Sequence, residues 1–415
     1  MKRILILIAS TIMILTLASC SDTMGLNKTV EVNTIPNTTV NKRTFPVVSD
    51  VYDTVNNTKY NTQTKETESS TESTNKKDNA TYTYDENTKT LTINIIGDMA
   101  EYDNNAPWSK VKNPENIVLT EGVTSIPNGG FGSFWVDAPE GNNNNYWKVK
   151  TIQLPNTITK IGFKAFIYCS SLEKINLPIN IKTLEQSVFE ECYNLKEITI
   201  PKNVKKIKYR AFYNCSGMEN VAFSNGVEKI GREVFKGCES LKTISLPDSV
   251  KEIGKRAFEF CTSLTEVKLP QNIVAINDYT FINCSKLKKI NIPKKVETIG
   301  KFAFWGCSNF EKVTIQNNVK SIGYCAFGNC KKLKKISISE GIKTIDKEAF
   351  FNCKKLKTIT IPKSVKKIGK RALGYIWKNN HSNTIIRKDG FTIKGYKGTA
   401  AEKYAKQNGF KFAAI

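Results

Sequence analysis

Cysteine recurs every 23 residues between positions 169 and 353 of this 415-residue chain. A phenylalanine lies three residues before each of these cysteines, from Phe166 to Phe350, and a large apolar residue lies three residues after each, from Leu172 to Leu356. A fixed period in the twenties predicts a repeat architecture, in which every unit buries its apolar side chains against its neighbours. The nine cysteines keep this interval without an insertion or deletion: Cys169, Cys192, Cys215, Cys238, Cys261, Cys284, Cys307, Cys330 and Cys353.

Each period also contains an alternating apolar pair that predicts a short strand closed by a turn. In one repeat the pair is Ile244 and Leu246, and Pro247 follows it. The rest of that repeat returns the chain and has a second set of apolar residues, which includes Ile253 and Phe258. We expect this return segment to contain a turn and a short helical segment.

The apolar order Leu-x-x-Ile-x-Leu at this period is typical of leucine-rich repeats, which stack one strand per repeat into a parallel sheet. The longer pattern Ile-x-Leu-Pro-x-x-Val-x-x-Ile-Gly-x-x-Ala-Phe-x-x-Cys-x-x-Leu, over residues 117–373, resembles the BspA-like leucine-rich repeats of bacterial surface proteins. Residues 84–126 and 395–405 are similar to the N-terminal and C-terminal caps of that family. The resemblance implies an α/β repeat solenoid: an arc with one short parallel strand per repeat, a β-rich N-terminal cap and a small C-terminal cap. It also implies an adhesin or host-interaction protein.

The first 19 residues predict a bacterial secretory signal. Lys2 and Arg3 precede an apolar run, residues 4–17, that is too short to span a bilayer. The run ends in the sequence Leu-Ala-Ser-Cys, which resembles the lipobox of bacterial lipoproteins, in which Cys20 would be lipidated after cleavage. We therefore expect an exported protein, exposed at the cell surface and attached to the membrane only through this lipid anchor. The alternative is a plain signal peptide followed by a chance cysteine.

The mature chain is expected to have four parts. Residues 20–79 are the lipidated cysteine and a tether rich in Thr, Asn and Ser, which is expected to be disordered because it has few apolar side chains. Residues 80–116 form the N-terminal β cap, residues 117–376 the repeat solenoid and residues 377–415 the C-terminal cap.

One interval between repeats is too long. Ile117 and Ile152 are 35 residues apart instead of 23, which predicts an insert at about 127–147. Aromatic residues on a loop rich in Gly and Asn are typical of contact loops, because rigid rings provide contact area at a low entropic cost. The alternative is that these rings cover the exposed end of the repeat array. The aromatic residues of the insert are Phe131, Phe134, Trp135, Tyr146 and Trp147.

Catalytic groups are scarce, and we predict a protein that is not an enzyme and has no cofactor and no metal. The one histidine, His381, lies in a polar turn, so a histidine-rich metal site is excluded. The nine periodic cysteines are expected to be buried free thiols, although disulfides between stacked repeats remain an alternative in an exported protein. Cys325 lies outside the period, in a register expected to face solvent, where it is either a neutral surface residue or a thiol that pairs between molecules.

Basic residues are concentrated in the repeats. The net charge is +24, and residues 147–415 contain 50 of the 62 Lys and Arg residues but 21 of the 38 Asp and Glu residues. Lysines in two registers would form stripes that attract anionic partners such as sulfated glycans; the alternative is a solvated face. Nucleic acid is a disfavoured partner, because the stripes lack interleaved aromatic residues. One stripe contains Lys174, Lys289, Lys312 and Lys335, and the other Lys205, Lys251, Lys320, Lys343 and Lys366.

Short polar side chains are predicted on the open side of the strands. Such a surface lets a partner approach the backbone closely, which favours docking of a protein over burial of a small molecule. The sequence therefore predicts a surface-displayed scaffold that binds host or neighbouring-cell proteins, with binding of polyanions through the lysine stripes as the alternative. The candidate contact residues on the strands are Gln153, Asn176, Thr199, Ser245, Lys268, Asn291 and Thr314.

Overall fold

The structure is a computed structural model that describes residues 80–101, 106–108, 111–131, 148–379 and 384–415. The chain divides into two units, residues 1–76 and residues 77–415, and all described residues belong to the second. The predicted signal peptide, Cys20 and the tether therefore lie outside the described residues. In the part of the chain that is described, no helix has the length and apolar character needed to cross a membrane.

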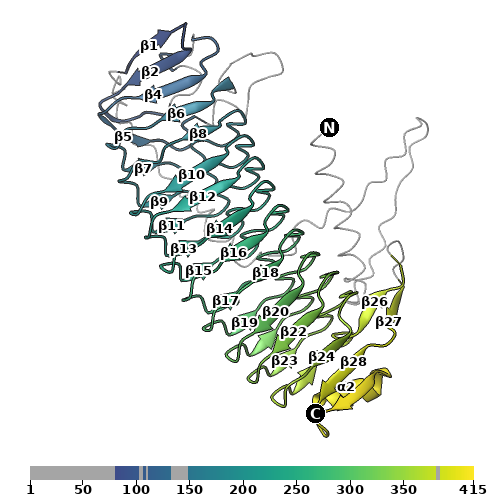
Figure 1. Cartoon of the computed structure of the whole chain (residues 1–415). Helices are drawn as coiled ribbons and strands as arrows, with labels where there is room; N and C mark the ends of the chain where they lie inside the picture. The colour runs from purple at the N-terminus through teal and green to yellow at the C-terminus, as the bar shows by residue number, and fades with distance from the viewer. Residues whose placement is uncertain (1–79, 102–105, 109–110, 132–147, 380–383) are drawn as a thin grey trace, which may run out of the picture. The chain divides into compact units, whose positions relative to one another are not determined.

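Two rows of parallel strands run along the second unit, and every repeat contributes one turn of the solenoid (Figure 1). The first row consists of β4 (Asn116–Leu119), β6 (Thr151–Gln153), β8 (Lys174–Ile175), β10 (Glu197–Ile200), β12 (Asn220–Phe223), β14 (Thr243–Ser245), β16 (Glu266–Lys268), β18 (Lys289–Ile290), β20 (Lys312–Ile315), β22 (Lys335–Ile338), β24 (Thr358–Thr360) and β28 (Thr392–Gly395). The second row consists of β3 (Gly97–Asp98), β5 (Val123–Ile126), β7 (Lys160–Ile161), β9 (Thr183–Leu184), β11 (Lys206–Ile207), β13 (Lys229–Ile230), β15 (Glu252–Ile253), β17 (Ala275–Ile276), β19 (Thr298–Ile299), β21 (Ser321–Ile322), β23 (Thr344–Ile345) and β25 (Lys367–Ile368). The predicted parallel-strand solenoid is confirmed, and the second row adds a two-residue strand to each repeat.

Side-chain alternation explains both rows. In β14, Ile244 points into the core, whereas Thr243 and Ser245 on either side of it are exposed. In β15, Glu252 is exposed and Ile253 is buried. Each strand therefore contributes its apolar side chains to one core between the rows, and the backbone pairs with the neighbouring repeats.

The return segment does not form the short helix that the sequence predicts. The Phe258 N–H donates to the Thr280 carbonyl of the next repeat at 2.9 Å, and the Cys261 N–H donates to the Phe258 carbonyl at 3.2 Å. An α-helix would instead satisfy these groups within its own segment through i to i−4 bonds. The turns thus form a third ladder of hydrogen bonds along the array, which replaces a helix.

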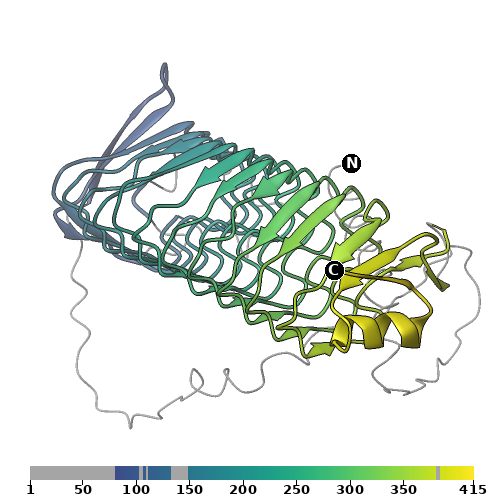
Figure 2. The same ribbon diagram turned by 60° about the horizontal axis from the view of Figure 1, so that its bottom comes forward.

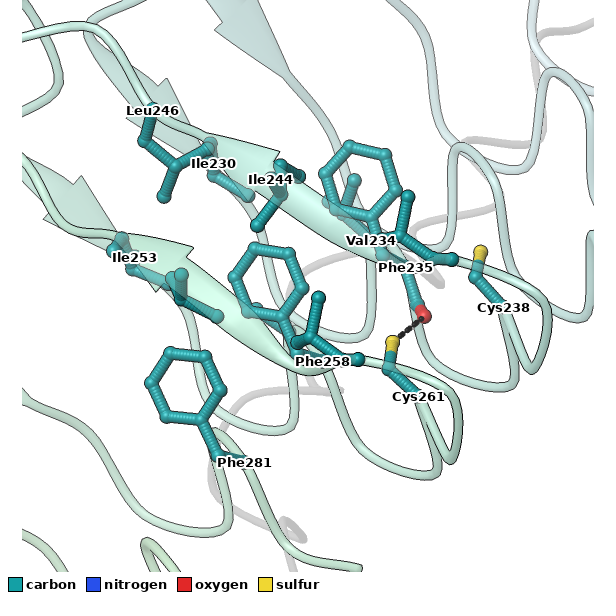
Figure 3. Packing of buried hydrophobic residues seen from close by; sticks show 14 of the residues in the cluster. Ile230, Val234, Phe235, Cys238, Ile244, Leu246, Ile253, Phe258, Cys261 and Phe281 are labelled. Carbon is teal, nitrogen blue, oxygen red and sulfur yellow. Dashed lines mark hydrogen bonds between the residues drawn. The ribbon is translucent and has the colours of Figure 1, made fainter. Parts of the chain in front are cut away.

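The core is built around a column of stacked phenylalanine rings (Figure 3). Successive rings lie 5.1 to 5.5 Å apart between centroids, from Phe131 to Phe350. Figure 3 shows Phe235, Phe258 and Phe281 arranged one after another in three consecutive repeats. Because each ring covers the next, no repeat has a complete core without its neighbours.

Strand pairing shows where the extra residues between Ile117 and Ile152 are inserted. Ile117 pairs with Ile152, Ile126 pairs with Ile161, and Phe131 stacks on Phe166, so the offset is 35 residues at all three points. The ordinary offset of 23 holds from Thr151, which pairs with Lys174. The extra residues therefore follow Phe131, and residues 127–131 belong to the repeat. Residues 132–147 lie outside the described residues.

Different elements cover the two ends of the array (Figure 2). At the N-terminal end β1 (Thr81–Asp85) pairs antiparallel with β2 (Thr90–Asn94), which pairs parallel with β4. At the C-terminal end β29 (Lys411–Ala414) pairs with β28, and β26 (Tyr375–Trp377) pairs antiparallel with β27 (Ile385–Arg387). The helix α2 (Ala400–Asn408) buries Ala401, Tyr404 and Ala405 and is capped by Gly409, which adopts the left-handed conformation that favours glycine.

Candidate binding surfaces

One exposed side chain in each repeat of the first strand row lies at the same position of the 23-residue period, and we call this set the strand face. Ser245 lies directly beside Lys268, and Thr314 lies directly beside Ser337 in the next repeat. Parallel neighbours of this kind are about 4.8 Å apart. The strand face comprises Gln153, Asn176, Thr199, Ala222, Ser245, Lys268, Asn291, Thr314, Ser337 and Thr360, all of which are exposed.

Asn176 differs from the other members of the strand face because its amide is already engaged. Its Nδ2 donates to the Leu154 carbonyl at 2.7 Å, and its Oδ1 accepts from the Leu154 N–H at 2.8 Å. This pair of bonds extends the ladder where β6 and β8 have no further backbone pairing. Asn176 therefore stabilises the edge of the sheet, and a partner would have to compete with two backbone bonds to use it.

The predicted lysine stripes are interrupted by glutamates from neighbouring repeats. Lys251 pairs with Glu228 at 3.0 Å, and Lys289 pairs with Glu266 at 3.5 Å. Both pairs are exposed and contribute little to stability. They nevertheless cancel positive charge locally, so neither stripe has a uniform positive charge along its length.

Of the five aromatic residues predicted in the insert, one lies in the core and the other four lie outside the described residues. Phe131 is buried, with 5% exposure, and its ring stacks on Phe166 at 5.5 Å. It is the first member of the phenylalanine column, so this ring is part of the core and is not accessible to a partner. Phe134, Trp135, Tyr146 and Trp147 lie outside the described residues.

The periodic cysteines are buried thiols with a defined hydrogen-bond partner. From Cys192 onward, each Sγ donates to the carbonyl of the phenylalanine 26 residues earlier; the Cys261 Sγ, for example, lies 3.2 Å from the Phe235 oxygen (Figure 3). Burial raises the pKa of the Cys169 and Cys353 thiols to about 12 and that of the other seven well above the ordinary value. None of the ten described cysteines forms a disulfide. Thiolate chemistry at these positions is suppressed, because the neutral form is the one that the core accepts.

The expectation that Cys325 faces solvent is wrong. Its side chain is fully buried, and its Sγ lies 3.7 Å from the Glu348 carboxylate. The backbone of Cys325 has a φ of 52°, and the same register in the other repeats has φ between 55° and 60°. This left-handed turn directs the Cys325 side chain against the next repeat. An intermolecular disulfide through Cys325 is therefore inconsistent with the folded state.

The register of Cys325 contains a set of buried charges that the sequence pattern did not reveal. The Glu233 carboxylate is buried and accepts from the Arg210 Nε at 2.7 Å and the Arg232 Nε at 3.0 Å. Burial alone would raise the pKa of Glu233, but the positive charges of Lys236 and Arg210 outweigh it and hold this pKa below its usual value. Loss of one partner would destabilise the fold, because it would leave a buried charge unpaired.

Among the described residues, we find no group of side chains whose arrangement suggests catalysis or metal binding. His381 lies outside them, and among them no group of three or more His, Cys, Asp or Glu side chains could hold a metal ion. The described surfaces can offer contact area and charge to a partner.

The repeats match the model of a known protein family. The model of the BspA-type leucine-rich repeat region matches residues 143–265 and 251–380, with six copies. No curated protein matches the sequence.

Several solved bacterial structures are similar to this chain. A leucine-rich repeat protein of Bacteroides ovatus is 21% identical over 81% of this chain and 98% of its own, with a TM-score of 0.48. A leucine-rich repeat protein of Eubacterium ventriosum is 22% identical over 73% of this chain and 94% of its own, with a TM-score of 0.40. A leucine-rich cell surface protein of Faecalibacterium prausnitzii is 20% identical over 62% of this chain and 92% of its own, with a TM-score of 0.28.

The family model covers more than half of the chain and spans the stacked repeats with their phenylalanine and cysteine columns. The chain belongs to the BspA-type leucine-rich repeat family.

Proposed function

We propose that this protein is a surface-displayed scaffold that binds other proteins through its strand face, in adhesion or host interaction. The observation that supports the proposal is the strand face itself: a set of exposed and mostly short, uncharged side chains at equivalent positions in ten repeats. Short side chains leave the sheet accessible to a partner's surface, and a rigid array needs little ordering when it binds.

Display at the cell surface is supported by the N-terminal sequence. The basic residues, the apolar run and Cys20 together favour export followed by lipidation of Cys20. Growing the producing bacteria with an alkyne-labelled fatty acid tests this step. The protein should take up the label, a Cys20→Ala variant should not, and protease added to intact cells should degrade the protein.

Binding is tested by capture of the purified protein on a panel of extracellular-matrix and bacterial surface proteins at about 0.05 and 0.5 M salt. A packed protein interface should persist at the higher salt concentration. A Thr199→Arg/Thr314→Arg variant places two large side chains on the strand face and should lose at least about tenfold in affinity. The matched control is Thr298→Arg, because Thr298 is exposed on the second strand row. Equal loss in both variants, or capture that disappears with salt, would contradict docking on the strand face.

A second candidate function is the binding of polyanions by the lysine registers. One observation favours it: Lys312 and Lys335 lie directly opposite each other on β20 and β22, and neither has an acidic partner within 4 Å among the described residues. A polyanion complex would lose affinity steeply with added salt, which distinguishes it from protein docking.

A further inference from the structure

The five residues that follow each periodic cysteine change their charge along the array. In the five repeats that begin at Cys169 to Cys261, these segments contain three lysines and five glutamates. In the four repeats that begin at Cys284 to Cys353, they contain eleven lysines and one glutamate. We call these eleven lysines the basic patch: Lys286, Lys288, Lys289, Lys312, Lys331, Lys332, Lys334, Lys335, Lys354, Lys355 and Lys357.

Most of the basic patch is exposed and has no compensating charge. Ten of its lysines are exposed, and Lys354 is half-buried. The glutamate of these segments, Glu311, pairs with Lys334 at 3.5 Å, and Glu266 in the preceding repeat pairs with Lys289 at 3.5 Å. Among the described residues, no ion pair forms at Lys286, Lys288, Lys312, Lys331, Lys332, Lys335, Lys355 or Lys357.

The solenoid brings these like charges together. Lys312 and Lys335 are direct neighbours in the parallel register, in which strands lie about 4.8 Å apart. Like charges on directly adjacent residues of neighbouring strands destabilise a sheet. The nearby Lys388 is affected too: burial, followed by the charges of Lys357 and Lys355, lowers the pKa of Lys388. The folded array therefore concentrates positive charge that an anion would compensate.

The shape and composition of the basic patch favour one class of anion. A shallow hollow of about 590 Å³ lies at its first repeats, lined by Lys288, Lys289, Lys312 and Lys332 together with Thr265, Glu266, Asn309 and Glu311. Phe310, the aromatic residue of these segments, is fully buried and offers no surface on which a base could stack, which disfavours single-stranded nucleic acid. Lysines repeated from one turn to the next suit a linear chain whose anionic groups also repeat, and lysine ammonium groups act as point charges towards such groups.

We propose that the basic patch is a binding site for linear sulfated polysaccharides, located on the C-terminal half of the array and bordering the strand face. This proposal rests on the second candidate function and deepens it: it assigns the ligand class and restricts the site to four of the repeats. It does not depend on protein docking at the strand face.

The test measures binding of heparin to the full chain by titration at several salt concentrations. A Lys331→Gln/Lys332→Gln/Lys335→Gln variant neutralises three charges of the patch. It should weaken heparin binding about tenfold or more and reduce the slope of log K against log salt by about 3. The matched control is Lys320→Gln/Lys343→Gln/Lys366→Gln, which removes the same charge from exposed lysines of the other register. It should bind heparin nearly as well as the unchanged protein.

Each other outcome overturns a defined part of the proposal. If the full chain does not bind heparin at low salt, polyanion binding itself is wrong. If both variants weaken equally, the protein binds through its net charge, and the basic patch is not a site. If an oligonucleotide or poly-glutamate binds more tightly than heparin with the same dependence on the patch, the site is correct and the ligand class is wrong. Both variants should melt no lower than the unchanged protein, which shows that they fold.

Discussion

At the scale of the residue, each periodic thiol from Cys192 onward donates to a carbonyl and fills space in the core. The Cys261 Sγ donates to the Phe235 oxygen at 3.2 Å, and the side chain is fully buried. We expect Cys261→Ala to lower the free energy of unfolding by about 1 to 2 kcal/mol, through a lost hydrogen bond and a small cavity. Urea denaturation measures the change. Ser263→Ala, at a half-buried position in the same repeat, is the control and should change it by less than about 0.5 kcal/mol.

The same thiols make the free energy of unfolding depend on pH in the alkaline range. Burial raises the pKa of Cys353 from 9.0 to about 12 in the folded state, so folding favours the protonated thiol. The stabilisation is complete below pH 9 and is lost as the pH rises from 9 towards 12. In this window, the free energy of unfolding should fall with pH in both proteins. The slope for Cys353→Ala should be smaller than that for the unchanged protein by about 1.4 kcal/mol per pH unit. Parallel curves in urea titrations at pH 8, 9, 10 and 11 would contradict this.

Single residues also mark where sequence reasoning failed. The period predicted the phenylalanine and cysteine columns, because identical residues at a constant interval must occupy equivalent sites in stacked repeats. The orientation of Cys325 could not be predicted in this way, because the equivalent positions in other repeats have no consistent polarity: they include Arg210, Glu233 and Phe302. A left-handed backbone decides that orientation, and the residues that adopt it here are not glycines.

At the scale of the element, the strands were more predictable than the turns between them. The pair Ile244 and Leu246 predicts β14 through its alternation, whereas two-residue strands such as β15 are too short to show a period. The return segment has helix-like apolar spacing, but its N–H groups bond to the next repeat, as at Phe258, and this tertiary pairing excludes a helix. The strand face could therefore be predicted, whereas the charges buried beside the turns could not.

The insert is the element whose role a mutation can decide. Phe131 belongs to the core, and the next aromatic residues along the chain are Phe134 and Trp135. Replacing Trp135 and Trp147 with Ala should weaken capture of a protein partner by about tenfold and leave the melting temperature unchanged, if these rings contact the partner. Capture assays and thermal melts of the same variant measure both quantities. A melting temperature that falls by several degrees would instead assign the rings to the cover of the array.

At the scale of the whole molecule, the ends of the array control whether the repeats stay folded. Interior repeats bury their core against two neighbours, but the last repeat is covered by β28, β26 and the helix α2, to which Phe391, Ile393 and Tyr404 contribute buried side chains. Deleting residues 377–415 would expose this face to water, since the truncated chain has no other segment to cover it. We expect the truncated chain to melt at least about 10 °C lower and to self-associate.

Deleting residues 1–76 is the matched control, because they form a separate unit from residues 77–415, and it should leave the melting temperature unchanged. A C-terminal truncation that melts like the full chain and stays monomeric in sedimentation would mean that the stack of phenylalanine rings stabilises the array without a cap.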